Sequence, residues 1–173
     1  MQKRLPERIQ PYRACERGLI LEGDCPLSAL TRLAGVLCES NGSVAAVLRF
    51  GYDEEHNPVI TGHVEGELTL QCQRCMAPYT HPIRVEVRLA LAHSVRESEG
   101  LTSAYEPFIA EADDASLYEL IEDELILNLP VVARHPEGQC LERIEERLHA
   151  DVEPQRENPF AVLKRLKSEP GRD

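Results

Sequence analysis

The stretch VITGHVEGELTLQCQRCMAPYTHPIRVEVRLAL, residues 59–91, decides the fold of this 173-residue chain. On both sides of its centre apolar and polar side chains alternate, which is typical of β-strands with one buried face. The buried faces are predicted to hold Ile60, Val64, Leu68 and Leu70 in the first strand and Ile83, Val85, Val87, Leu89 and Leu91 in the second. Because the chain reverses at Cys72 to Cys75, the stretch predicts a long antiparallel hairpin.

Neighbouring segments extend this sheet and supply helices that can cover it. Residues 44–50 alternate as a third strand, residues 19–21 predict a peripheral strand and residues 105–109 a short one. Apolar residues recur at helical spacing over 27–37 and over 117–128, where Ser116 and Glu119 form a capping-box pattern and Pro130 stops the helix. We therefore predict an α+β fold, in which an antiparallel sheet built on the long hairpin packs two or three helices on one face. Gly62 and Gly66 fall on the apolar face, which indicates a bulge or close packing of another element.

The last part of the chain differs in character from the rest. Residues 1–155 are predicted to form a single α+β domain, and residues 156–173 a linker with a short basic amphipathic helix over 158–167. A helix of about ten residues is marginal alone in water, so it needs a surface on which to dock. We predict that it binds a partner through Phe160, Leu163 and Lys164.

Charge is distributed unevenly along the chain, whose net charge is −11 at pH 7. Residues 1–96 carry 11 acidic and 11 basic side chains, whereas residues 97–157 carry 17 acidic and only 4 basic ones. Nucleic-acid phosphates are bound by Lys and Arg, and the acidic segment would repel them. A basic protein is therefore the expected partner of this segment, and a solvated surface that aids solubility is the simpler alternative.

The composition excludes several classes of protein. Three Phe, five Tyr and no Trp are too few for the stacking platforms of single-strand nucleic-acid binders. No apolar run approaches 18 residues, and the first residues lack the apolar region of a secretory signal. Six irregularly spaced Cys then indicate reduced thiols, so we expect a cytoplasmic protein with no membrane segment.

Cys72-Gln-Arg-Cys75 is the motif with the clearest chemical meaning. Two thiolates three positions apart on a turn can bind one tetrahedral Zn²⁺, and His135 and Cys140, on one predicted loop, can supply the other ligands. His81 is a closer but less favoured fourth ligand. A redox dithiol and two ordinary thiols at a turn are the alternatives, although the βαβ context of a redox motif is missing. The remaining cysteines have no ligand spacing and are predicted to be buried: Cys15, Cys25 and Cys38.

The acidic run Glu122-Asp123-Glu124 does not form a catalytic pair. Adjacent side chains on a helix point about 100° apart, so these carboxylates do not converge. A charged helix face is the simpler interpretation, and partner binding through the three residues is the functional one. The sequence also has no Ser-His-Asp order, phosphate-binding glycine loop or dinucleotide motif. We therefore predict no catalytic residues, no enzymatic activity and no small-molecule substrate.

Several motifs, in the same order along the chain, resemble the YceD family of bacterial large-subunit ribosomal RNA accumulation proteins. They are the opening MQK, LQCQRC (70–75), AYEP (104–107), IEDELILNLPVV (121–132) followed by His135 and Cys140, and NPFAVLKRLK (158–167). Many members have a richer cysteine cluster, so the resemblance implies a structural zinc ion. Cys72, Cys75 and Cys140 match that cluster, but His135 stands where those members have a Cys and their later cysteines are missing. A lost or weakened metal site is therefore the alternative.

The resemblance implies a non-catalytic ribosome biogenesis factor needed for synthesis, processing or stability of large-subunit (23S) rRNA. Together with the charge distribution, it favours a basic ribosomal protein or an rRNA-processing factor as partner, with an indirect effect on rRNA. The first alternative is direct RNA binding through the basic tail and three hairpin arginines, Arg74, Arg84 and Arg88. The second is a metal-dependent enzyme, which would need converging carboxylates or His ligands that the sequence does not offer.

Overall fold

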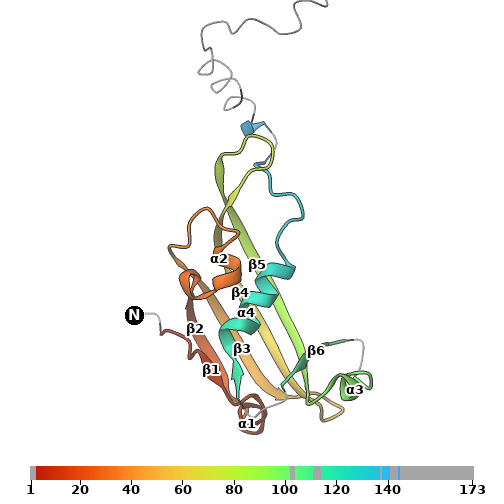
Figure 1. Cartoon of the computed structure of the whole chain (residues 1–173). Coiled ribbons are helices and arrows are strands. Elements are labelled where there is room, and N and C mark those ends of the chain that lie inside the picture. The colour runs from red at the N-terminus through yellow and green to blue at the C-terminus, as the bar shows by residue number, and fades with distance from the viewer. Residues whose placement is uncertain (1–2, 102–103, 111–113, 137, 141–143, 145–173) are drawn as a thin grey trace, which may run out of the picture. The chain divides into compact units, whose positions relative to one another are not determined.

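A five-stranded sheet forms the centre of the computed structural model (Figure 1). The structure describes residues 3–101, 104–110, 114–136, 138–140 and 144. The strand order in this sheet is β2-β3-β4-β5-β6. Its strands are β2 (Ile20–Pro26), β3 (Ser43–Tyr52), β4 (Pro58–Gln71), β5 (Pro78–Ala92) and β6 (Glu106–Ile109). A small second sheet pairs β1 (Arg8–Ile9) with β7 (Ala115–Ser116).

The long hairpin predicted from residues 59–91 is present as β4 and β5. Their antiparallel register runs from Val59 opposite Ala90 to Gln71 opposite Pro78. β3 pairs with β4 only as far as Glu65, and beyond it the hairpin continues as an arm (Figure 1). Outside the named strands, an isolated bridge joins Glu39 to Thr69 of this arm. This arm carries the Cys72–Cys75 turn at its end.

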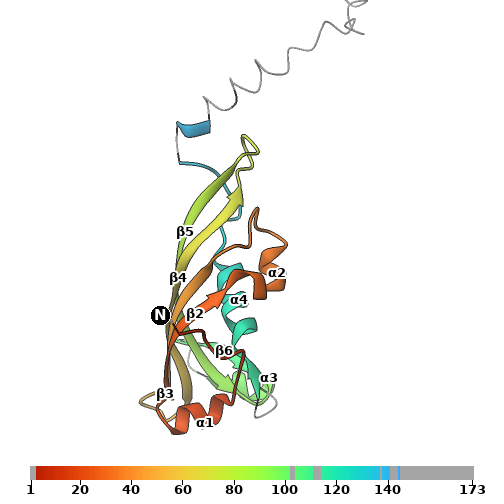
Figure 2. The same ribbon diagram turned by 90° about the vertical axis from the view of Figure 1, so that its left-hand side faces the viewer.

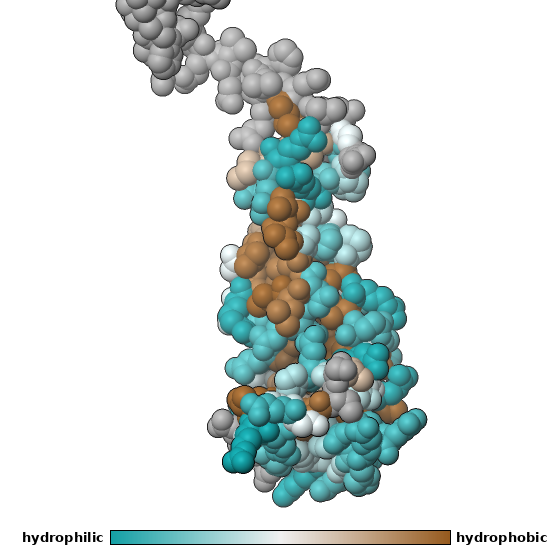
Figure 3. All heavy atoms as spheres, turned by 90° about the vertical axis from the view of Figure 1, so that its right-hand side faces the viewer, coloured by the Kyte–Doolittle hydropathy of each residue, from teal (hydrophilic) through white to brown (hydrophobic). Residues whose placement is uncertain are grey.

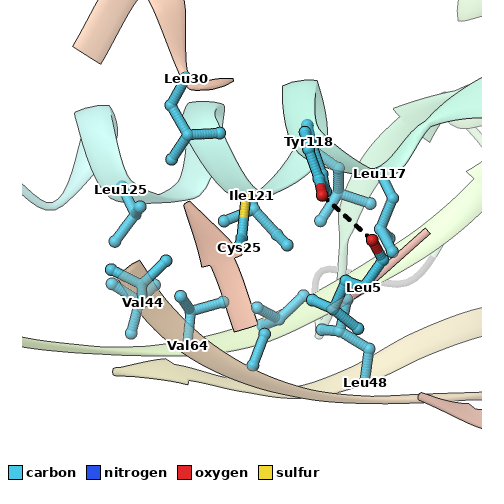
Figure 4. Packing of buried hydrophobic residues seen from close by; sticks show 14 of the residues in the cluster. Leu5, Cys25, Leu30, Val44, Leu48, Val64, Leu117, Tyr118, Ile121 and Leu125 are labelled. Carbon is cyan, nitrogen blue, oxygen red and sulfur yellow. Dashed lines mark hydrogen bonds between the residues drawn. The ribbon is translucent and has the colours of Figure 1, made fainter. Parts of the chain in front are cut away.

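One face of the sheet is covered by helices and forms the core. Figure 2 shows α2 (Thr31–Ala34) and α4 (Leu117–Leu127) on the same side of the sheet. In Figure 4 the apolar side chains of α4 face those of the sheet across the core; they include Leu117, Ile121 and Leu125 on one side and Val44, Leu48 and Val64 on the other. The opposite face of β4 carries half-buried or exposed polar residues. The alternation in the sequence therefore predicted the buried face correctly, and the α+β fold class is confirmed.

The helix α4 begins and ends as the sequence predicted. The Ser116 Oγ accepts a hydrogen bond from the Glu119 backbone N–H at 3.2 Å, as an N-cap residue does. The helix ends at Leu127, shortly before Pro130. Near its start the Tyr118 hydroxyl donates to the Leu5 carbonyl oxygen at 3.0 Å (Figure 4), which ties the N-terminal segment to α4.

Two expectations about individual elements are wrong. The helix predicted over 27–37 is broken into the 3₁₀ turn η1 (Leu27–Ala29) and the four-residue α2. Leu27, Leu30 and Leu33 are all buried, so their helical spacing indicated burial rather than a continuous helix. The sheet is also not wholly antiparallel, because β6 pairs with β5 in parallel after a connection that contains α3 (Val95–Ser98).

Gly62 lets β3 and β4 approach each other closely. Its φ is +155°, and a Cβ at this position would lie 1.9 Å from the Val47 carbonyl oxygen. A side chain cannot be accommodated there without moving one of the two strands. The close packing predicted from a glycine on the apolar face of β4 is therefore confirmed.

No helix among the described residues combines the length and apolar character that crossing a membrane requires. The remaining helix, α1 (Pro11–Glu16), lies between β1 and β2 in the sequence. The predicted domain boundary at residue 155, the tail helix over 158–167 and its residues Phe160, Leu163 and Lys164 lie outside the described residues.

Candidate metal centre

The turn between β4 and β5 holds Cys72 and Cys75 through backbone hydrogen bonds. The Cys72 N–H donates to the Ala77 carbonyl at 2.9 Å, and the Met76 N–H donates to the Cys72 carbonyl at 2.8 Å. The Arg74 backbone N–H points at the Cys72 Sγ, 3.4 Å away. Both cysteines are buried. The thiolate is the form of cysteine that binds metals, and this turn presents two cysteine sulfurs from one end of the hairpin.

The segment that follows α4 returns to this turn. The Ala133 carbonyl accepts a hydrogen bond from the Gln73 N–H at 2.8 Å. His135 follows two residues later, a span of at most about 7 Å. Further along, the Cys140 Sγ lies 3.6 Å from the His135 Nδ1. The loop between these two residues contains Gly138, whose φ of +92° favours glycine.

The four predicted ligands come together. The ligand atoms of Cys72, Cys75, His135 and Cys140 all lie within 4.8 Å of one another. In a tetrahedral zinc site, bonds of about 2.3 Å to sulfur and 2.0 Å to nitrogen place neighbouring ligand atoms about 3.5–3.8 Å apart. The separation of 3.6 Å between Sγ and Nδ1 agrees with this geometry. Three thiols and one imidazole therefore form a plausible metal site with donors that zinc prefers.

The other histidine and cysteine candidates lie outside this cluster. The His81 ring makes an edge contact with Tyr79, with 6.1 Å between centroids. Cys15 and Cys25 are buried, as predicted, but Cys38 is exposed, so the prediction for Cys38 is wrong. Burial raises the pKa of Cys15, and it raises the pKa of Cys25 to about 12. These two thiols are consequently poor nucleophiles.

The three consecutive carboxylates of α4 lie in different environments. Glu122 is 3% exposed and accepts hydrogen bonds from α2, whereas Asp123 is exposed and pairs with the Arg32 Nη1 at 2.7 Å. Glu124 is 8% exposed, and its carboxylate has no hydrogen bond or ion pair with any described residue. The carboxylates do not converge. The Glu122 carboxylate is engaged inside the protein by three hydrogen bonds and is therefore not available to a partner.

The two buried glutamates have opposite pKa shifts. Burial alone would raise the pKa of Glu122, but hydrogen bonds from the Leu33 N–H and from Arg32 outweigh burial and lower it. Burial raises the pKa of Glu124, and the nearby charges of Glu106 and Asp123 raise it further. The sequence analysis did not single out Arg32 or Glu106. Arg32 acts on a residue ninety positions away. Glu106 lies in the AYEP motif, but the motif gives no sign that it would face Glu124.

The arginines predicted to bind RNA are spread along the hairpin. Arg74 is exposed on the turn. Arg84 pairs with Glu65 at 2.6 Å and with Glu86 at 3.3 Å. The Arg88 guanidinium lies over the Tyr105 ring, 5.7 Å from its centroid. Two of the three arginines are therefore engaged within the protein.

Fold and site together define an α+β protein with a candidate Cys₃His metal centre at the end of a hairpin arm. The chain belongs to the YceD family: its residues 60–167 match the family described as large ribosomal RNA subunit accumulation protein YceD. It is also 31% identical, over 172 residues, to the large ribosomal RNA subunit accumulation protein YceD of Haemophilus influenzae. That similarity covers 96% of this chain and 99% of the relative. No solved structure matches the chain. The resemblance stated from the motifs is thus confirmed.

Proposed function

We propose that this protein is a non-catalytic ribosome biogenesis factor, needed for the synthesis, processing or stability of 23S rRNA and acting in the cytoplasm through protein partners. One observation carries the proposal. The similarity to a protein named for large ribosomal RNA subunit accumulation extends over 96% of this chain. The partner is a basic ribosomal protein or an rRNA-processing factor, because a net charge of −11 attracts basic proteins and repels RNA.

We further propose that Cys72, Cys75, His135 and Cys140 bind one structural Zn²⁺. The three cysteines are buried, and the four ligand atoms lie close enough for tetrahedral coordination. A metal with four protein ligands has no open position for a water molecule. The metal would therefore stabilise the fold. A catalytic zinc ion would need one coordination position left open for water or substrate.

Direct RNA binding is the second candidate function. It would use Arg74, Arg84 and Arg88 together with the basic tail, and the exposed position of Arg74 on the turn favours it. The ion pairs of Arg84 with Glu65 and Glu86 count against it, because RNA phosphates would have to displace these carboxylates. We therefore rank it below action through a protein partner.

The function is tested in a strain that lacks the protein. We expect the ratio of 23S to 16S rRNA to fall, and a plasmid copy of the gene to restore it. The purified complex should keep its protein partner after nuclease treatment. An unchanged rRNA ratio would contradict the proposed function. Loss of the complex on nuclease treatment, with ultraviolet crosslinks between RNA and the hairpin arginines, would instead support the second candidate.

A further inference from the structure

Glu124 lies in a groove between α4 and the edge of the sheet. Two adjoining hollows, with volumes of about 280 Å³ and 620 Å³, meet there. Both are lined by Leu89 of β5, Glu106 of β6, and Glu124 and Leu127 of α4. The smaller hollow adds an apolar wall made by Phe108 and Ile126. We call the surface made by these six residues the Glu124 groove.

The carboxylate of Glu124 is the unusual feature of this groove. The residue is 92% buried, since 8% of its surface is exposed, and its carboxylate has no hydrogen bond or ion pair with any described residue. Two residues earlier on the same helix, Glu122 is 3% exposed and accepts three hydrogen bonds. The Glu124 oxygens are not among the buried side-chain atoms that lack a hydrogen-bond partner, so they reach the surface of the groove. A largely buried charge without a cationic partner destabilises the folded protein, and a cation that enters the groove would offset that cost.

The charged groups around Glu124 make the binding of a cation in the groove more favourable. Glu106 and Asp123 both act on the Glu124 carboxylate with negative charge. Arg32 also lines the smaller hollow, but Glu122 and Asp123 already engage its guanidinium. In the larger hollow Glu86 pairs with Arg84, and the Arg88 guanidinium lies over the Tyr105 ring. Negative charge is therefore in excess at the groove.

Apolar side chains are exposed at the edge of the groove and along the chain that follows it. Leu127 of α4 is 71% exposed, and in the segment after α4 Val131 is 96% and Val132 is 43% exposed. Figure 3 looks at the side of the molecule where β5, β6 and this segment lie, and it shows a band of apolar surface there. Exposed apolar surface beside a largely buried carboxylate is typical of a protein docking site.

We propose that the Glu124 groove binds a Lys or Arg side chain of a basic partner protein, within a segment whose aliphatic neighbours cover Leu127. The inference rests on the proposed function, for which it names the docking surface. The cation pairs with Glu124 and Glu106, and the aliphatic residues pack on Leu127 and on the valines that follow. Charge complementarity and apolar contact together select a basic amphipathic segment over an RNA phosphate.

The test measures binding of the purified full-length protein to fluorescent 15-residue peptides that tile the large-subunit ribosomal proteins. We expect peptides with a Lys or Arg beside aliphatic residues to bind. Glu124→Gln and Leu127→Ser should each weaken their binding at least tenfold. Glu67→Gln is the matched control, because Glu67 is an exposed carboxylate on β4 away from the groove, and it should change binding less than twofold.

Stability separates a binding defect from a folding defect. Glu124→Gln removes a largely buried charge that has no cationic partner among the described residues, so its melting temperature should rise or stay unchanged while binding is lost. Glu122→Gln removes a hydrogen-bonded charge, so its melting temperature should fall. Binding that survives Glu124→Gln overturns the proposal, as do peptides that bind no tighter than their scrambled versions. A peptide of residues 158–167 that outcompetes every tiling peptide also overturns it, because the chain's own segment would then occupy the groove.

The strain lacking the protein keeps the two proposals apart. If 23S rRNA falls in that strain but peptide binding does not depend on Glu124, only the groove assignment fails. If 23S rRNA is unchanged, the proposed function fails whatever the peptides do. Both proposals together predict that a strain carrying Glu124→Gln accumulates less 23S rRNA than a strain carrying Glu67→Gln.

Discussion

The carboxylate of Glu122 in α4 is joined to Arg32 in α2 by two hydrogen bonds. Its Oε1 accepts from the Arg32 backbone N–H and its Oε2 from the Arg32 Nε, each at 2.7 Å. The Leu33 N–H adds a third bond to Oε1 at 3.0 Å. The first N–H groups of a helix have no acceptors inside the helix. In α2 the Glu122 carboxylate, which belongs to another helix, accepts hydrogen bonds from two of them. One buried side chain thus fixes α2 against α4 above the core.

We expect Glu122→Gln to lower the free energy of unfolding by about 2 kcal/mol, because charge-assisted hydrogen bonds become neutral ones and one amide hydrogen replaces an acceptor. Urea unfolding followed by circular dichroism measures this change. Asp123→Asn is the control: Asp123 also pairs with Arg32, but it is exposed, and a surface ion pair contributes little. Equal destabilisation by the two variants would contradict the capping role of Glu122.

The sequence predicted the sheet well because its strands have one buried and one polar face. From Ile60 to Leu70 apolar residues and two glycines alternate with polar residues, and a period of two has no other common structural meaning. It failed at residues 27–37, where three buried leucines at helical spacing lie in η1, in the connection and in α2. Burial alone produces such spacing, so periodicity could not show where the chain leaves the helical conformation.

The candidate site could be predicted only in its local parts. Cys72 and Cys75 are close in the sequence, and so are His135 and Cys140, so each pair is recognisable from spacing. The different roles of Glu122 and Glu124 were not predictable. They are the same residue type two positions apart, and one has a partner ninety positions away while the other has none among the described residues. Which carboxylate meets a donor depends on tertiary packing.

The two buried glutamates are expected to have opposite effects on stability as the pH changes. The pKa of Glu122 is lowered in the folded protein. Its ionised carboxylate therefore adds to the free energy of unfolding above the pKa of glutamate in the unfolded chain, about 4.3. This stabilisation is lost as the pH falls through the pKa of Glu122 in the folded protein. The pKa of Glu124 is raised in the folded protein. Its carboxylate therefore does not destabilise the protein at low pH, where it is protonated. The destabilisation grows as the pH rises from about 4.3, the pKa of glutamate in the unfolded chain, through the pKa of Glu124 in the folded protein.

Melting temperatures from pH 3.5 to pH 8 test this prediction. Compared with the wild type, Glu124→Gln should gain stability as the pH rises, and Glu122→Gln should lose it. Glu106 and Asp123 are the carboxylates that act on Glu124, and Arg32 and Arg88 are the cations in the adjoining hollows, so the salt concentration must be held constant. Parallel pH profiles for the two variants would contradict the assignment.

Gly62→Ala is expected to destabilise the protein by about 3 kcal/mol, because alanine is strained at a φ of +155° and its Cβ would overlap the Val47 carbonyl oxygen. Gly51→Ala, in the neighbouring strand β3, is the matched control. A Cβ at Gly51 meets nothing within 4 Å, so this variant should be neutral or slightly more stable. Thermal unfolding of both variants gives the comparison, and a stable Gly62→Ala protein would show that the strands can separate at little cost.

Thiol labelling should distinguish the cysteines outside the metal cluster. Cys38 is exposed, whereas Cys15 and Cys25 are buried and Cys25 has a pKa raised to about 12. At pH 8 we expect iodoacetamide to modify Cys38 within minutes, and Cys15 and Cys25 only when the protein unfolds. Mass spectrometry of peptides at successive times measures these rates. Rapid labelling of Cys25 under native conditions would contradict its position in the core.

Removal of the metal is expected to destabilise the protein, because four ligands from distant parts of the sequence lose their common partner. Protein purified without chelator should contain about one zinc per chain, and a strong chelator should lower its melting temperature by roughly 10 °C. Cys72→Ser and His135→Ala should reproduce the lower melting temperature and make the protein insensitive to chelator. Cys38→Ser is the control, since Cys38 lies outside the cluster, and it should keep both the zinc and the wild-type melting temperature. A zinc-free protein whose melting temperature does not respond to chelator would show that the four side chains stabilise the hairpin turn without a metal.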